Sequence, residues 1–197
     1  MKCYDLHTHR ANPDFPSVGL HPWHLTEQHL AACLLQLERE ASRPEIMAIG
    51  EAGLDRLCGT PFPLQLQAFR RVIRIADDVG KPLVIHCVKS VGELLALKKE
   101  YSPRNTWILH GFRGKPETAV QLQHSGISLS FGEKFNVRAL QATSPDRLFV
   151  ETDESSLTIE DIYGRVAVAL HVSREVLCRQ VHQNIVKAFG HLPNLNV

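Results

Sequence analysis

Seven short apolar runs alternate with amphipathic stretches along this 197-residue chain, and this alternation constrains the fold more than any other feature. Each run has four to six residues and is rich in Ile, Val, Leu or aromatic residues, as strands buried on both faces are. The runs are Cys3–His7, Val18–His21, Ile46–Glu51, Leu83–His86, Thr106–His110, Ile127–Phe131 and Leu148–Asp153. Strand, helix and strand in repeated alternation predict parallel strands with right-handed crossovers, hence an α/β fold.

Helices are expected in the stretches between the runs. Apolar residues recur with helical spacing from Leu30 to Leu37 and from Leu66 to Ala76. Ser90 and Glu93 have the spacing of a capping box at the start of a third helix. Further helices are predicted over Pro116–Ser125, Asn136–Thr143, Thr158–His171 and Ser173–Phe189.

Length and composition favour one globular domain spanning residues 1–197, with 44% hydrophobic and 22% charged residues. The net charge of +1 gives no global attraction to nucleic acid or membrane, although a local patch can supply one. No apolar run approaches the roughly 18 residues of a membrane span, and the first ten residues do not form a secretory signal. Five scattered cysteines are typical of reduced thiols. We therefore expect a cytoplasmic protein without membrane contact; the oligomeric state stays open.

Ionisable side chains end six of the seven apolar runs. Taken singly, each has an ordinary interpretation as a core histidine, a helix N-cap or a loop carboxylate. Together they are harder to explain by packing, because burying an unpaired charge is costly and a metal ion supplies a partner. In a (β/α) barrel, unlike an open doubly wound sheet, all strands deliver their C-terminal residues to one mouth. The candidate metal ligands are His7, His9, Glu51, His86, His110 and Asp153.

Four histidines and two carboxylates exceed what one tetrahedral ion needs. We therefore expect two divalent ions about 3.5–4 Å apart that share a bridging carboxylate. Imidazole-rich ligation suits zinc, whereas the carboxylates admit manganese or magnesium.

Six motifs in order resemble the TatD family of metal-dependent hydrolases, members of the amidohydrolase superfamily best known for deoxyribonuclease activity. They are Asp5-x-His7-x-His9, Gly19-Leu20-His21-Pro22, Ile49-Gly50-Glu51-Ala52-Gly53-Leu54-Asp55, Val84-Ile85-His86-Cys87, Leu109-His110-Gly111-Phe112 and Glu151-Thr152-Asp153. The resemblance implies a TIM-barrel-like fold, with His7, His9, Glu51 and Asp153 on one ion. It implies Glu51, His86 and His110 on the other, so that Glu51 bridges the two.

The chain also departs from the family pattern. A (β/α)8 barrel typically needs about 250 residues, and only eight residues separate His9 from Val18, too few for a crossover. We therefore expect an incomplete or distorted barrel of about seven parallel strands, with one β/α unit missing near the N-terminus. The segments after His86 and after Asp153 also differ from the family's usual residues.

The expected activity is phosphodiester hydrolysis by a metal-activated hydroxide, with DNA or another phosphoester as substrate. Asp153 is the candidate proton acceptor and Glu51 the second catalytic carboxylate. Basic loop residues make a positive mouth, in which His21, Lys89 and Arg113 are candidate phosphate contacts. Asp5, Asp55 and Glu151 are candidates for orienting the histidines.

Three alternatives stay open on the sequence alone. The chain could hydrolyse a C–N bond or a phosphoester of a small molecule, because this type of metal site serves several chemistries. It could instead be a non-catalytic metal-binding domain. A histidinol-phosphatase-like (PHP) assignment of His7-x-His9 followed by Asp14 explains the segments Gly50–Asp55 and Glu151–Asp153 less well.

Overall fold

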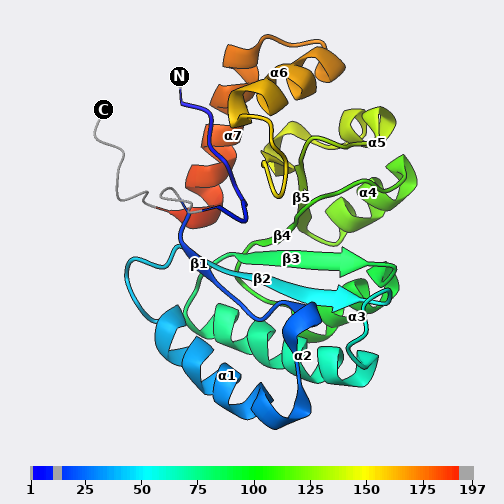
Figure 1. Cartoon of the computed structure of the whole chain (residues 1–197). Coiled ribbons are helices and arrows are strands. Elements are labelled where there is room, and N and C mark those ends of the chain that lie inside the picture. Colours follow the sequence, from blue (N-terminus) through cyan, green and yellow to red (C-terminus); the bar gives the residue numbers. More distant parts are fainter. Residues whose placement is uncertain (1, 11–14, 191–197) are drawn as a thin grey trace. The chain divides into compact units, whose positions relative to one another are not determined.

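Six parallel strands alternate with seven α-helices in the computed structural model, which describes residues 2–10 and 15–190 (Figure 1). Asp14 lies outside the described residues. The chain divides into two compact units. Unit 1 comprises Met1–Phe15 and Leu109–Val197, and unit 2 comprises Pro16–Ile108. The α/β class predicted from the alternation is confirmed, whereas a single domain over residues 1–197 stays a prediction.

Unit 2 is built on parallel strands that follow one another in sequence order. Its elements are β1 (Ser17–Val18), the 3-10 helix η1 (Pro22–His24), α1 (Glu27–Ala41), β2 (Ala48–Asp55), α2 (Phe62–Asp78), β3 (Leu83–Val88), α3 (Val91–Tyr101) and the start of β4 (Trp107–Leu109). β2 pairs with β1 on one side and with β3 on the other. The helices α1 and α2 lie on the same side of β2 and β3 (Figure 1).

Unit 1 contains the remaining strands and the N-terminal segment. Its elements are α4 (Pro116–His124), β5 (Ile127–Phe131), α5 (Val137–Gln141), the 3-10 helix η2 (Pro145–Arg147), β6 (Leu148–Val150), α6 (Ile159–Leu170) and α7 (Arg174–Phe189). β5 pairs with β6 in parallel. The N-terminal segment runs parallel to β6, with an isolated bridge between Thr8 and Asp153 and a hydrogen bond of 3.0 Å from the Leu6 amide to the Val150 carbonyl.

Six of the seven apolar runs form strands, where about seven parallel strands were expected. The run Cys3–His7 is the exception, because its backbone meets Val150 and Asp153 at separated points and forms no continuous ladder. The six strands form one sheet in the order β1 to β6. The incomplete barrel expected from the short chain is confirmed.

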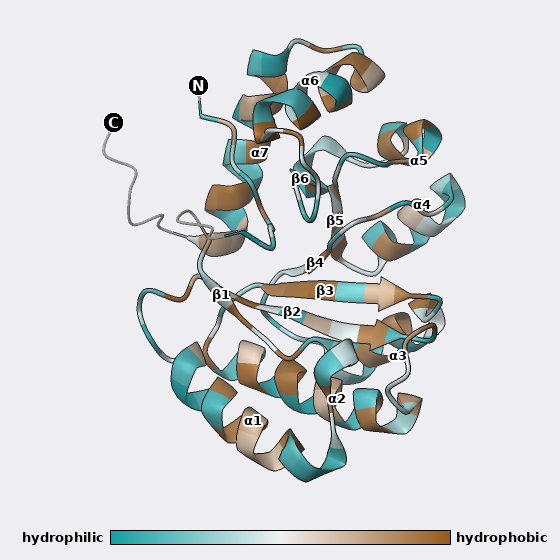
Figure 2. Cartoon of the chain, viewed as in Figure 1, coloured by the Kyte–Doolittle hydropathy of each residue, from teal (hydrophilic) through white to brown (hydrophobic). Residues whose placement is uncertain are grey.

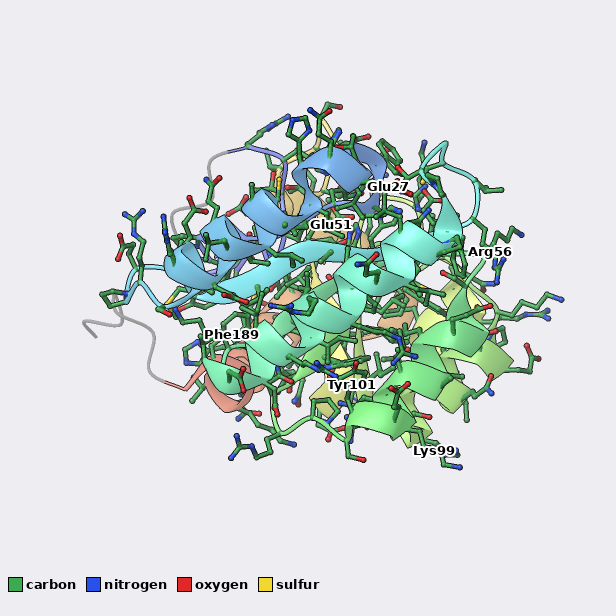
Figure 3. All side chains as sticks on the ribbon, turned by 90° about the horizontal axis from the view of Figure 1, so that it is seen from below. Glu27, Glu51, Arg56, Lys99, Tyr101 and Phe189 are labelled. Atoms are coloured by element: carbon green, nitrogen blue, oxygen red, sulfur yellow. The ribbon has the colours of Figure 1, made fainter. Side chains whose placement is uncertain are left out.

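The predicted helices are all present, within a few residues of their expected bounds. The capping box at Ser90 and Glu93 was wrong. Ser90 directs its hydroxyl to the Leu54 carbonyl at 3.0 Å, and Glu93 forms an ion pair with Arg56. Arg56, labelled in Figure 3, also lies with its guanidinium 4.0 Å from the ring centre of Phe62. Arg56 therefore has partners of both kinds within unit 2.

The core of unit 2 lies between the strands and α2. Figure 2 shows β3 as hydrophobic along its length except for one hydrophilic band. The buried residues of α2 include Leu64, Phe69, Val72 and Ile73, which form one face of the helix. Each such side chain contributes about 1.5–3 kcal/mol when fully buried. This packing fixes β2 and β3, the two strands that carry Glu51 and His86.

A β-bulge interrupts the register of β2 beside the most specific motif of the sequence. Ile49 pairs with Leu83 and Ala52 with Ile85, so β2 uses three residue steps where β3 uses two. The extra residue falls within Gly50–Glu51. Bulges of this kind bend a strand and re-aim a side chain, and they are frequent next to active sites.

Gly53 is required by the close approach of β2 to β3, and we expect Gly53→Ala to destabilise the protein by about 2–4 kcal/mol. Gly53 has φ of +152°, and an added Cβ would lie 2.0 Å from the His86 carbonyl oxygen. Thermal or urea unfolding measures the change. Gly164→Ala in α6 is the matched control, since its Cβ meets nothing within 4 Å and alanine stabilises a helix by about 0.5–1 kcal/mol over glycine. Equal stability of the two variants would contradict the steric argument.

Candidate metal centre

Both units carry histidines and carboxylates whose donor atoms lie within 4.8 Å of one another. In unit 1 the groups are His7, His9 and Asp153, and His110, Glu151 and Asp153. In unit 2 the group is His21, Glu51 and His86. Every ligand proposed from the sequence belongs to one of these groups.

The N-terminal segment and the loop after β6 hold the first group of unit 1. His9 Nε2 lies 3.3 Å from Asp153 Oδ1, and His7 Nε2 lies 4.0 Å from the same oxygen. The backbone ties these residues together, because the Asp153 amide donates to the His7 carbonyl at 2.9 Å and the His9 amide donates to the Asp153 carbonyl at 3.2 Å. Two imidazole nitrogens and one carboxylate oxygen therefore lie within 4.8 Å of one another.

His110 follows β4 directly and is oriented by Glu151. Its Nδ1 lies 3.5 Å from Glu151 Oε1, which also accepts a hydrogen bond of 2.5 Å from the Gly111 amide. The rings of His110 and His7 are 4.8 Å apart between centres. Burial works to raise the pKa of Glu151, but hydrogen bonding and charge from His110 and His7 bring that pKa below its ordinary value. Glu151 thus acts as an ionised partner for His110, which supports its expected orienting role.

The two histidines of the unit 2 group both face the same carboxylate oxygen, Oε1 of Glu51. His86 Nδ1 lies 2.6 Å from Glu51 Oε1, and His21 Nε2 lies 3.2 Å from the same atom. The sequence placed Glu51 and His86 at strand ends, which is wrong for both. Glu51 lies in the bulge within β2, and His86 lies within β3 opposite Gly53. Figure 3 labels Glu51 on the β2 ribbon.

His21 caps the 3-10 helix η1, and its two ring nitrogens have different partners. Nδ1 accepts a hydrogen bond of 3.3 Å from the Trp23 amide, so the ring proton resides on Nε2, which faces Glu51. His21 is therefore arranged to donate a hydrogen bond. Sequence reasoning did not foresee that His21 shares an oxygen of Glu51 with His86. The histidine of the motif Gly19-Leu20-His21-Pro22 was the available signal.

Asp55 stands behind His86 and connects it to Trp23. Its Oδ2 lies 3.2 Å from His86 Nε2 and accepts a hydrogen bond of 2.7 Å from Trp23 Nε1. Burial works to raise the pKa of Asp55, but the hydrogen bonds from Trp23, the Leu57 amide and His86 bring that pKa below its ordinary value. Asp55 fits the expected role of a carboxylate that orients a histidine. The Gln65 side chain, which the sequence did not single out, holds the Asp55 backbone from both sides.

Asp5 holds the loop that carries Asp153. Its two carboxylate oxygens accept hydrogen bonds from the Thr152 amide at 2.9 Å and the Thr152 hydroxyl at 2.6 Å. Burial raises the pKa of Asp5, although these two hydrogen bonds oppose the shift. Asp5 was expected to orient histidines. Its hydrogen bonds fix Thr152, the residue before Asp153.

A cavity of about 230 Å³ opens beside Asp153 in unit 1. Its walls come from three loops: Gly111 and Arg113, Gly132–Lys134, and Glu151–Ser155. Arg113 and Lys134 thereby bring two cationic side chains to the cavity that contains Asp153. Lys89 is exposed in unit 2, three residues after His86, and has a positive φ of 52°.

The donors fit divalent metal ions. Imidazole nitrogens and carboxylate oxygens are the ligands that zinc accepts, and the carboxylates also suit manganese and magnesium. Four ionisable side chains of the two units, His7, His86, Glu51 and Asp153, are at most one-fifth exposed. A bound cation compensates the cost of burying such carboxylates, as the sequence pattern predicted.

The family profile and the relatives that match this chain carry the same family name. A family profile described as TatD related DNase matches residues 3–190. The 3'-5' ssDNA/RNA exonuclease TatD of Musicola paradisiaca is 30% identical over 160 residues, 76% of this chain and 60% of that protein. The human 3'-5' RNA nuclease TATDN2 is 30% identical over 178 residues, 81% of this chain and 23% of that protein. The chain thus covers less than two thirds of the length of these two relatives.

Solved structures share the fold. The TatD homologue YJJV of Escherichia coli superposes with a TM-score of 0.80 at 20% identity, covering 90% of this chain and 77% of that one. A TatD-family hydrolase of Entamoeba histolytica gives 0.74 at 22% identity, covering 89% and 74%. The TIM-barrel-like α/β fold expected from the resemblance is confirmed. Among the described residues, no helix combines the length and apolar character needed to cross a membrane.

Proposed function

The chain belongs to the family of TatD-related DNases, and on that premise we propose that it hydrolyses phosphodiester bonds of DNA with the help of two divalent ions. The observation that supports this most is the presence, in each unit, of imidazole and carboxylate donors within 4.8 Å of one another. Such donor sets hold the ions used in hydrolysis of phosphoesters. Nuclease names among the relatives support nucleic acid as the substrate class.

The proposed ligands follow the two groups of donors. His7, His9 and Asp153 would hold one ion, and His86 with Glu51 would hold the other. The assignment of His110 to the second ion, and of Glu51 as the bridge, comes from the family resemblance and stays a prediction. When bound, divalent ions lower the pKa of a water molecule and polarise the oxygen under attack.

The protein's own residues supply the proton transfer and the phosphate contacts. Asp153 accepts the proton of the attacking water at a carboxylate oxygen and returns it to the leaving oxygen. Arg113 lines the cavity beside Asp153 and is placed to attract a phosphate. His21, which lies beside Glu51, and Lys89, which follows β3, are the other candidate phosphate contacts. Glu151, Asp55 and Asp5 keep the ligand side chains and their loops in place.

The test uses purified protein stripped of metal and reconstituted separately with zinc, manganese and magnesium. Each form is assayed against single-stranded DNA, single-stranded RNA, a generic phosphodiester and a dipeptide panel. Cleavage of DNA supports the proposal. Turnover of only a small phosphoester or a dipeptide favours a small-molecule hydrolase, and metal binding without any hydrolysis favours a metal-binding domain.

Metal removal is expected to abolish hydrolysis and to lower thermal stability together. Binding to the folded state alone stabilises it by about 2.7 kcal/mol when free metal is 100 times the dissociation constant. Thermal unfolding with and without each metal measures this stabilisation of the folded state independently of activity. A melting temperature that does not respond to any of the three metals would contradict binding at these donors.

A further inference from the structure

Trp23 combines an exposed ring with a buried hydrogen-bond partner. Trp23 is 54% exposed, whereas Asp55 is only 3% exposed. Asp55 accepts a hydrogen bond of 2.7 Å from Nε1 of Trp23. Among the large hydrophobic residues exposed in the described part of the chain, Trp23 alone is aromatic. Packing does not account for so large a ring at this place, because about half of it faces solvent.

Three contacts fix the orientation of the indole. Besides the hydrogen bond to Asp55, the indole lies perpendicular to the ring of His21, at 4.9 Å between ring centres and 89° between planes. It meets His86 at 6.0 Å and 80°. Its backbone is held as well, because it lies in η1 and its amide donates to His21 Nδ1. A ring whose orientation is already fixed loses little entropy when a ligand covers its exposed surface.

The position of the ring relates it to the candidate ligands. Both histidines that it touches face Glu51 Oε1, at 3.2 Å for His21 and 2.6 Å for His86. A nucleotide whose phosphate lies at these side chains would carry its base beside Trp23. Aromatic side chains next to a backbone-binding site stack on bases of any sequence, provided that the bases are not paired in a duplex.

We propose that Trp23 is the stacking platform for a nucleobase of single-stranded nucleic acid bound at the unit 2 donors. This inference rests on the proposed function, since it assumes that a phosphodiester binds at the same side chains. The anchor to Asp55 sets the plane of the ring, and the solvent-facing surface takes the base. The platform makes binding depend on an unpaired base and favours single strands over duplex.

The test measures binding of oligothymidylate with phosphorothioate linkages to the metal-loaded full chain. Fluorescence reports on the platform, because the chain has two tryptophans and Trp107 is fully buried. We expect the oligonucleotide to quench the emission of the wild type and to leave that of Trp23→Phe unchanged. We expect Trp23→Ala to raise the dissociation constant about 5- to 150-fold, and Trp23→Phe, which keeps a ring, to raise it less. Leu35→Ala, at a half-exposed position on α1, is the control that leaves affinity unchanged.

An abasic residue in the oligonucleotide separates stacking from a structural role. If Trp23 stacks on a base, removing the base nearest the scissile linkage makes wild type and Trp23→Ala bind equally. If the difference persists on the abasic strand, Trp23 acts only by holding Asp55 and His86, and the proposal is overturned. Equal affinity of wild type and Trp23→Ala on ordinary strands also overturns it while leaving the nuclease proposal intact. Failure of the wild type to bind or cleave any nucleic acid overturns the proposed function itself.

Discussion

Asp153→Asn is expected to lower kcat for DNA hydrolysis by about 10²–10⁴-fold, the range for loss of a general acid–base group. The amide oxygen can still face His7 and His9, but it cannot accept the proton of the attacking water. The backbone hydrogen bonds between Asp153 and the N-terminal segment do not involve the side chain, so the fold is expected to persist. Single-turnover cleavage of a labelled single-stranded oligonucleotide measures the loss.

The control for Asp153→Asn is Glu160→Gln, which neutralises an exposed carboxylate in the first turn of α6. Its kcat is expected to equal that of the wild type. Metal analysis of Asp153→Asn is expected to show that at least the ion assigned to His86 and His110 is retained. A variant that keeps full turnover would remove Asp153 from the role of proton acceptor.

Glu51→Gln is expected to reduce the metal content from about two ions per chain to less than one. Glu51 Oε1 is the carboxylate oxygen that His86 and His21 face, and an amide is a much weaker ligand for a divalent ion. The family resemblance also assigns Glu51 to both ions, so its loss is expected to weaken both. Elemental analysis after equilibration with each metal measures the content.

Glu93→Gln is the matched control, because Glu93 is also a carboxylate of unit 2 but pairs with Arg56. It is expected to retain the metal content of the wild type. A wild-type protein that binds less than one ion per chain at saturating metal would contradict the assignment of two ions. Equal and modest losses of activity in Glu51→Gln and Asp153→Asn would contradict their separate roles.

The alternation of apolar runs was sufficient to predict the parallel α/β architecture and the helices, because buried strands and amphipathic helices have different periodicities. It was not sufficient for Cys3–His7. Tyr4 and Leu6 are buried like strand residues, but the backbone hydrogen-bond partners of Leu6 and His7, at Val150 and Asp153, lie more than 140 positions away. The sequence pattern contains no information on that spacing.

The candidate ligands were found from their residue types, whereas their places within the strands were not. The apolar runs stop at Glu51 and His86 because these residues are charged or polar, yet β2 continues to Asp55 and β3 to Val88. For Glu51, the place within the strand coincides with the bulge at Gly50–Glu51. It depends on the register between β2 and β3, which hydrophobicity along one strand does not specify.

The hydrogen bonds between the N-terminal segment and the β6 region determine the order in which the candidate ligands can come together during translation. His7 and His9 are translated before their carboxylate partner Asp153 and the backbone that holds them, which lie about 145 residues later in the sequence. The unit 2 donors His21, Glu51 and His86 all precede Asp153 as well, and they find one another within a much shorter stretch of chain. All donors of unit 2 are therefore translated before His7 and His9 can meet their partner.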